Sequence, residues 1–391
     1  MFRRVKYTLF LKDVFILSVT AFGGAQSHVA HFHKLLVSRR RYLSEEELME
    51  LNSLCQMLPG PSSTQTLIAI GFRLGGPNLA YLTLLIWMLP AVIIMTTSAI
   101  LMADIQEKSW STQFTRFIQP MAVGLVSYGA YTISLRTVKT KTGIALMILA
   151  GVFSYLFQTP FVFPVILLMS GLITALKYKN HPKHEKKKIS IEWANFILWI
   201  GVLLVAAGLG ALTKALPIRI FENFYRNGSL IFGGGQILTP MLYTEFVEYK
   251  KYLTSDEFLS GYAVAQALPG PVFSFSSYIG SLSMREYGIG GEILGALMAA
   301  FGVFLPGTFL IFFVIRFWES LKKYRAVRAS LEGLTAASAG LVAAAAVIMF
   351  QPLENTFTNF AVTIATFLLL TFTRVPSSLI ILGGLLLGFV L

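Results

Sequence analysis

This chain has one cysteine, few charged residues and fewer acidic than basic ones, and each shortage excludes a class of protein. Cys55 alone cannot form an internal disulfide or a thiolate metal cluster. Charged residues make up 13% of the 391 positions and hydrophobic residues 55%, a balance that excludes a soluble multidomain protein. The sequence contains no spacing typical of metal ligands, of a nucleotide-binding loop or of a nucleophile with its base. We therefore expect no cofactor, no metal and no enzyme activity.

The sequence contains long apolar runs, whereas the sequences of soluble domains alternate apolar with polar residues. Those long enough to cross a bilayer, or nearly so, cover residues 78–103, 117–135, 193–213, 293–315, 334–353, 355–373 and 375–391. The apolar stretch 143–176 is too long for one span, and Gln158-Thr159-Pro160 divides it into two helices. The pattern predicts an all-α polytopic protein of the lipid bilayer, with about 9–13 membrane segments.

Basic residues outnumber acidic ones, 32 against 19, and they gather in short loops. The positive-inside rule explains this bias better than nucleic acid does, so we expect no nucleic acid partner. The rule places the N-terminus and the loops 136–141, 177–188 and 316–328 in the cytoplasm. Residues 177–192 are then a basic cytoplasmic linker between a first repeat, 1–176, and a second repeat with one extra leading span, 193–391.

Two helix-breaking motifs occur twice with constant spacing. Phe22-Gly23-Gly24-Ala25-Gln26 returns 210 positions later as Phe232-Gly233-Gly234-Gly235-Gln236, and Leu58-Pro59-Gly60-Pro61 returns as Leu268-Pro269-Gly270-Pro271. Further on, Leu89-Pro90-Ala91 matches Leu305-Pro306-Gly307 at a spacing of 216. We expect two homologous halves with broken or re-entrant helices. The run 193–213 has no counterpart in the first half, and one extra crossing predicts that the halves are inverted repeats.

The repeated motifs suit the binding of an anion at membrane depth. Pro61 and Pro271 fit the first turn of a helix, where free amides favour an anion, and paired glycines let a ligand approach the backbone. Proline kinks with capping serines, and tight helix crossings, are the structural alternatives. The expected substrate-binding residues are Gly23, Gly24, Gln26, His28, Pro59, Gly60, Pro61, Ser62, Ser63, Gln65, Gly233, Gly234, Gly235, Gln236, Pro269, Gly270, Pro271 and Ser274. We expect the amides of Gly24, Gly60, Gly234 and Gly270 to converge on the anion.

His28 is the histidine in the most apolar surroundings, and its titration range suits proton coupling. A hydrogen-bonded structural histidine is the alternative. Asp13 and Glu222 are the carboxylates that would carry the proton if His28 does not.

Phe22-Gly23-Gly24 with His28, Gln56 with Leu58-Pro59-Gly60-Pro61, and the second copies of both motifs resemble the chromate ion transporter family in its two-domain, long-chain form. The resemblance runs over essentially the whole chain. Ala25 and Gln236 differ from it, since the family usually has proline and often histidine there. It implies export of chromate, or of a related tetrahedral oxyanion such as sulfate, across the bacterial plasma membrane, driven by the proton motive force.

Two other functions are compatible with helix breaks in a membrane protein. A membrane enzyme or flippase acting on a lipid or polyprenyl phosphate could hold the phosphate at the same helix N-termini, although no catalytic group is organised for it. Channels also have broken helices, but their filters are usually symmetric across subunits. Action as a monomer and action as a homodimer are both compatible with the sequence.

Overall fold

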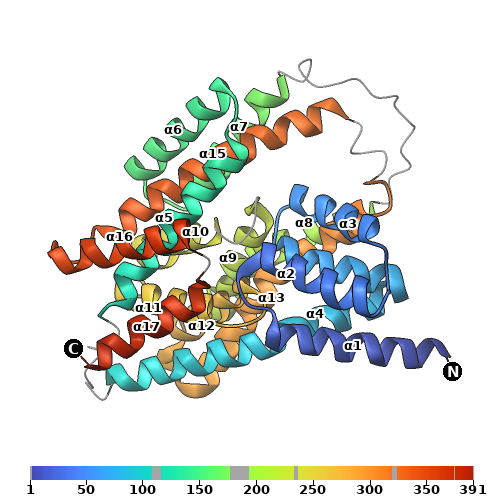
Figure 1. The fold of residues 1–391 in the computed structure, drawn as a ribbon, viewed down its shortest axis with the longest axis horizontal. Helices are drawn as coiled ribbons and strands as arrows, with labels where there is room; N and C mark the ends of the chain where they lie inside the picture. The colour runs from blue at the N-terminus through green and yellow to red at the C-terminus, as the bar shows by residue number, and fades with distance from the viewer. Residues whose placement is uncertain are drawn as a thin grey trace. The chain divides into compact units, whose positions relative to one another are not determined.

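The computed structural model of this chain describes residues 2–107, 116–176, 193–232, 237–318, 324–373 and 375–390, which form helices joined by turns and loops (Figure 1). The helices form two compact units, and each unit draws on both halves of the sequence. Unit 1 comprises Met1–Trp110, Glu192–Gly235 and Val264–Arg316, and unit 2 comprises Ser111–Ile191, Gln236–Ala263 and Phe317–Leu391. The compact units therefore do not coincide with the two repeats of the sequence. The boundaries of the repeats stay a prediction.

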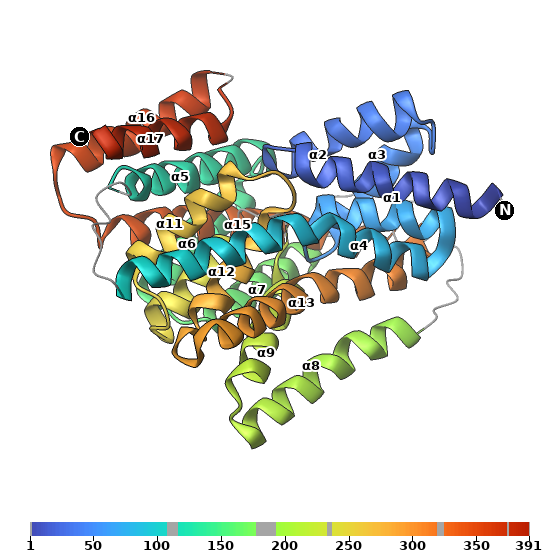
Figure 2. The same ribbon diagram turned by 90° about the horizontal axis from the view of Figure 1, so that it is seen from below.

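Unit 1 contains the helix breaks. Its helices are α1 (Phe2–Thr20), α2 (Gly24–Phe32), the π-helix η1 (His33–Arg39), α3 (Glu45–Met57), α4 (Ser62–Glu107), α8 (Ala194–Thr213), α9 (Leu216–Leu230), the 3₁₀ turns η5 (Val272–Ser274) and η6 (Arg285–Tyr287), α12 (Phe275–Leu282) and α13 (Gly288–Val314). Helix α13 packs on α9 and α8, and α4 packs on α1, α12 and α13 (Figure 2). Helix α4 is broken at Gly75 and Gly76, just before Pro77.

Unit 2 is arranged around one long helix, α15 (Arg325–Phe350), which packs against α5 (Ile118–Thr137), α6 (Lys141–Leu156), α7 (Val162–Leu176) and α10 (Leu238–Tyr243). Helix α5 packs in turn against α16 (Phe357–Phe372) and α17 (Ser377–Val390). The π-helix η4 (Thr244–Tyr249) follows α10, and α11 (Ser255–Ala267) is divided between the units. Gly340 of α15 meets the backbone of α6, and its counterpart Gly124 meets the backbone of α16, so glycine allows both close crossings.

Most elements of the two halves correspond in chain order, which confirms the prediction of homologous halves. Helices α1, α2, α3, α5, α6 and α7 match α9, α10, α11, α15, α16 and α17, and the π-helices η1 and η4 match each other. Even a strained turn recurs, because Arg41 and Lys251, 210 positions apart, both have φ +55°. Helix α8 has no counterpart and is the extra helix that the sequence indicated.

Four helical segments are long and apolar enough to cross a membrane by length and composition: Ser62–Ile105, Ala194–Thr213, Arg285–Val314 and Ala329–Phe350. Five shorter apolar helices, of 10–17 residues, accompany them in the described part of the chain. Helix α8 exposes many of its large side chains, including Ile197 and Leu204, each 65% exposed. Such a surface is suited to lipid rather than water.

We predict that the two halves have opposite orientations in the membrane, because α8 would add one crossing ahead of the helices that are repeated. Asn78 and Tyr287 are exposed at matching breaks, after the first Pro-Gly-Pro helix and after the second. Single cysteines at these positions, in a chain with Cys55→Ser, should react with an impermeant maleimide from opposite sides of the membrane. Reaction from the same side would show parallel repeats.

Candidate functional site

Both helix breaks predicted in the first half are present in unit 1. Helix α1 ends at Thr20 and α2 begins at Gly24, and the turn between them has φ +95° at Gly23 and +78° at Gly24. The turn between α3 and α4 has φ +115° at Gly60. A residue with a Cβ adopts positive φ at a cost of about 1–2 kcal/mol, which explains glycine at all three positions.

The second half repeats the Pro-Gly-Pro turn with Gly270 at φ +92°. Pro271 is followed by the 3₁₀ turn η5 before α12 begins, so this helix starts with a tighter turn than α4 does. Gly233, Gly234, Gly235 and Gln236 lie outside the described residues, and the side chain of Gln26 does too.

Hydrogen bonds hold each Pro-Gly-Pro turn to the other half of the chain. The amide of Gly60 donates to the carbonyl of Ile231 at 2.7 Å, and the amide of Gly270 donates to the carbonyl of Ala21 at 2.9 Å. Ile231 is the counterpart of Ala21, and Gly270 is the counterpart of Gly60, each 210 positions later. A contact that recurs with its partners exchanged indicates a two-fold relation. The broken helices of the two halves therefore meet around a pseudo-two-fold axis inside unit 1.

Each turn also packs on the proline-kinked helix of the other half. A Cβ at Gly60 would lie 3.2 Å from the Cα of Gly307 on α13. In the matching place, a Cβ at Gly270 would lie 3.4 Å from the Cβ of Ala91 on α4 and 3.1 Å from the carbonyl of Ser18. Glycine is thus required for both conformation and close approach. The amides of Gly60 and Gly270 already have acceptors, so in this conformation they are not available to an anion.

Gln65 fastens the first Pro-Gly-Pro turn to α13. Its Nε2 donates to the carbonyl of Pro59 at 2.8 Å and to the carbonyl of Gly307 at 3.2 Å. Two carbonyl partners fix which end of the amide is nitrogen. Gln65 is fully buried, and we infer from these bonds that it holds the turn in place.

His28 is a buried polar side chain at the first break. Its side chain is 1% exposed, and its Nδ1 lies 3.1 Å from the Oγ of Ser63 on α4. The ring of Trp87 packs edge-on against His28 at 5.3 Å, and its Nε1 donates to the Oγ1 of Thr64 at 3.0 Å. The Nε2 of His28 is buried without a hydrogen-bond partner among the described residues. Two of the expected binding residues, His28 and Ser63, are therefore in contact although they come from different helices.

The second half keeps this backbone but not its polar side chains. Leu238 is the counterpart of His28, and two phenylalanines, Phe273 and Phe275, are the counterparts of Ser63 and Gln65. At the second break, Ser274 is 1% exposed, and its hydroxyl has no partner in the described part of the chain. The histidine–serine contact is therefore found in the first half and not at the matching positions of the second.

The remaining expected residues lie at the two Pro-Gly-Pro turns. Ser62 is 8% exposed at the first turn of α4. Pro61 precedes it, and the backbone carbonyl of Pro61 accepts from the amide of Gln65 at 2.8 Å. Pro269 and Pro271 line a small pocket with Ser274 and Met95.

Sequence reasoning missed a buried charge cluster beside the first break. Asp13 of α1 is fully buried, and its carboxylate accepts from Arg40 Nη2 at 2.9 Å and from the Tyr42 hydroxyl at 2.8 Å, with Arg40 Nε also at 2.9 Å. Burial and the bond to Asp13 raise the pKa of Tyr42, which lies in a loop outside the four apolar segments, so its hydroxyl stays a donor. The spacing of 27 positions between Asp13 and Arg40 gave no sequence signal.

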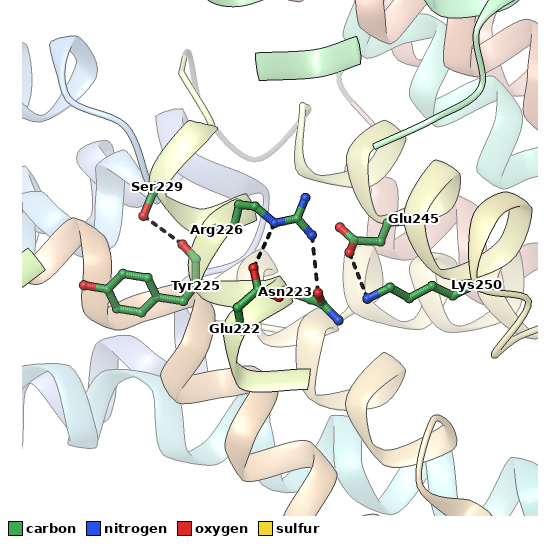
Figure 3. A network of polar contacts seen from close by, with 7 residues as sticks. All are labelled: Glu222, Asn223, Tyr225, Arg226, Ser229, Glu245 and Lys250. Carbon is green, nitrogen blue, oxygen red and sulfur yellow. Dashed lines mark hydrogen bonds and ion pairs between the residues drawn. The ribbon is translucent and has the colours of Figure 1, made fainter. Parts of the chain in front are cut away.

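Charges are paired differently at the matching place in the second half. Asn223 replaces Asp13, and on α9 Arg226 donates from Nε to Glu222 at 3.2 Å and from Nη2 to the Oδ1 of Asn223 at 3.3 Å (Figure 3). In unit 2, Lys250 directly follows η4 and is the counterpart of Arg40, and its Nζ lies 3.0 Å from Glu245 of η4 (Figure 3). Both alternative proton carriers named from the sequence, Asp13 and Glu222, thus hold a cation.

We predict that Gly60→Ala and Gly270→Ala each destabilise the folded protein by about 2 kcal/mol or more, because each adds strain at positive φ and crowds a neighbouring helix. Thermal unfolding in detergent would measure the loss. Gly201→Ala on α8 is the control, since its Cβ would meet no atom within 4 Å. Equal stability of all three variants would show that the turns do not hold the halves together.

We predict that Asp13→Ala lowers the free energy of unfolding by about 2–4 kcal/mol, because it leaves Arg40 and Tyr42 without their shared acceptor. The double variant Asp13→Ala with Arg40→Met should recover part of that loss. Chemical denaturation of the purified protein would measure both, and a double variant no more stable than Asp13→Ala would argue against the pair.

Comparison with known proteins gives the chain a family. The sequence model described as Chromate transporter matches residues 8–175 and 218–389, one match in each half. A protein named "Probable chromate transport protein" from Synechococcus elongatus is 26% identical over 333 residues, 85% of this chain and 82% of the relative. A "Chromate transport protein" from Cupriavidus metallidurans is 23% identical over 397 residues, 96% of this chain and 90% of the relative.

A "Chromate transport protein" from Pseudomonas aeruginosa is 26% identical over 339 residues, 85% of this chain and 78% of the relative. No solved structure matches the chain. These relatives are named as transport proteins, which favours transport over the enzyme that the sequence left as an alternative. Since matches to one family cover most of both halves, the chain belongs to the chromate transporter family.

Proposed function

We propose that this chain exports chromate, or a related tetrahedral oxyanion such as sulfate, across the plasma membrane of a bacterium. Membership of the chromate transporter family supports the substrate. The pseudo-two-fold meeting of broken helices supports a secondary transporter, because that architecture places a substrate site between two repeats that can alternate in exposure. No part of the proposal requires a cofactor.

The site that we propose for the oxyanion lies at the first break, next to His28 and Ser63. A dianion taken out of water needs several donors, but a set of buried arginines would bind it too tightly for release. The Nδ1···Oγ contact between His28 and Ser63 places two neutral polar groups side by side, and the backbone is open at Gly24, where α2 begins. Ser62 and Ser274 extend the set of neutral donors. This contact is the observation on which the proposed site rests.

Proton coupling is the second part of the proposal, with His28 as the residue next to the substrate that can change charge. A cationic imidazole would strengthen oxyanion binding, and its loss of the proton would weaken binding and favour release. The chain would act as a monomer or a homodimer, since nothing in this mechanism requires a partner subunit.

Flux into proteoliposomes tests the proposed function directly. Purified protein should move labelled chromate, with sulfate, molybdate and phosphate as competitors, and an imposed proton gradient should raise the initial rate. Transport of a lipid phosphate, or no oxyanion flux under any gradient, would contradict the proposal.

We predict that Ser63→Ala weakens chromate binding by about 1–3 kcal/mol, the cost of losing a hydrogen bond to a charged ligand. His28→Gln should in addition remove the pH dependence of binding. Ser53→Ala is a matched control, because that exposed hydroxyl donates to the carbonyl of Met49 on its own helix. Isothermal titration at several pH values would measure all three, and wild-type binding by Ser63→Ala and His28→Gln would place the site elsewhere.

A further inference from the structure

Three serines on and just before α12 are buried with their hydroxyls unused. Ser274, Ser277 and Ser281 are each at most 1% exposed, and none of their Oγ atoms has a hydrogen-bond partner in the described part of the chain. Serines in apolar helices commonly bond a carbonyl of the preceding turn. Ser276 and Ser283 of the same segment do so, with Phe273 and Ile279. The other three serines, spaced three and four apart, lie along one face, so a second kind of partner is needed for them.

An unpaired carboxyl oxygen lies on the neighbouring helix. Glu292 of α13 is 4% exposed, and its Oε1 has no hydrogen-bond partner among the described residues. Helices α12 and α13 are antiparallel, with Gly280 pressed on the carbonyl of Gly295 and Gly291 beside the carbonyl of Met284. In this register, Glu292 lies level with residues 280–284, the C-terminal end of α12 and the two residues after it.

The helical positions place Glu292 and the serines on the same side of this crossing. At about 100° per residue, Glu292 is turned by 60–100° from Gly291 and Gly295 on α13, and Ser281 is turned in the same sense, by 100°, from Gly280 on α12. Because the helices are antiparallel, turns in the same sense point to the same side of the crossing. Ser277 and Ser274 follow on that side, one turn at a time.

Helix α4 covers this side of the crossing between α12 and α13. Ala91 and Met95 of α4 line one small pocket with Ser274, and further along α4 the charge of Asp104 acts on Glu292. Helix α4 therefore runs beside the whole row, from the Pro-Gly-Pro break to Glu292. We call the four groups Ser274, Ser277, Ser281 and Glu292 the polar seam.

The charged residues near the polar seam indicate which ion could move along it. Asp104 of α4 and Arg285 of η6 are the charged residues that act on Glu292. Helix α12 and helix α8 contain no charged residue, and α9 meets α13 farther along, around Gly302 and Val303. Two carboxyl groups at one end would repel an oxyanion, but a carboxyl group can take up and release a proton.

We propose that the polar seam is a proton pathway, in which Glu292 binds a proton and the three serines relay it to the second Pro-Gly-Pro break. Hydroxyls one helical turn apart have Cβ atoms about 5–6 Å from each other, a gap that one water molecule can bridge. Serine suits a relay because its hydroxyl both donates and accepts. The inference rests on the proposed proton coupling, since it supplies the route by which protons would reach the site.

Infrared difference spectroscopy tests the proton-binding step without any transport. The full chain in lipid should show a carboxylic acid C=O band that disappears as the pH is raised, and Glu292→Gln should lack that band. Glu222→Gln is the control, because Glu222 is paired with Arg226 and should leave the band unchanged. The same band in Glu292→Gln would overturn the proposal.

Proton movement during transport tests the serine relay. In proteoliposomes containing a pH-sensitive dye, Ser277→Ala and Ser281→Ala should each slow chromate-dependent proton movement severalfold. Ser276→Ala and Ser283→Ala are the matched controls on the same segment and should be as fast as wild type. Equal rates in all four variants would overturn the relay. A wild-type protein without chromate-dependent proton movement, but with a Glu292 band, would contradict proton coupling and still support Glu292 as the proton-binding residue.

Discussion

The structure depends on how a broken helix satisfies its backbone inside an apolar protein. An amide left without an acceptor at membrane depth costs several kcal/mol, so each break needs a partner outside its own helix. Here the two halves supply each other: Gly60 bonds to Ile231, and Gly270 bonds to Ala21. Neither Pro-Gly-Pro turn is complete without the opposite half. This exchange explains why the compact units mix the halves of the sequence rather than separating them.

The two halves share their backbone conformation but differ in polar side chains at the first break. The glycines of the turns, the kinked prolines and the π-helices are duplicated. They give the two halves the same backbone conformation. His28 and Ser63 are not duplicated, since their counterparts in the second half are Leu238 and Phe273. A symmetric scaffold can alternate between two similar states, whereas the asymmetric pair of His28 and Ser63 fits the single substrate site that we propose. The polar seam continues this division, because Ser277 has Leu67 as its counterpart in the first half.

Much of the fold could be predicted from the sequence, because apolar run length, glycine and proline act locally. The breaks at Gly23 and Gly60, the matching halves and the unpaired helix α8 all follow from such signals. Tertiary partners could not be predicted in this way. The amide of Gly60 was expected to face an anion but bonds to Ile231, and the amide of Gln65 holds a turn. Asp13 with Arg40, and Glu292 with its serines, required knowledge of which helices lie side by side.

The exchanged contact between the halves is tested most directly by cysteine cross-linking. The rings of Phe72 and Phe312, one from each half, lie 4.9 Å apart. Their counterparts are Leu282 and Thr96, so a two-fold relation requires that pair to be close as well. In a Cys55→Ser chain in native membranes, a short bismaleimide should link Phe72→Cys to Phe312→Cys, and Leu282→Cys to Thr96→Cys, with similar yields. Linkage of the first pair without the second would contradict the two-fold arrangement.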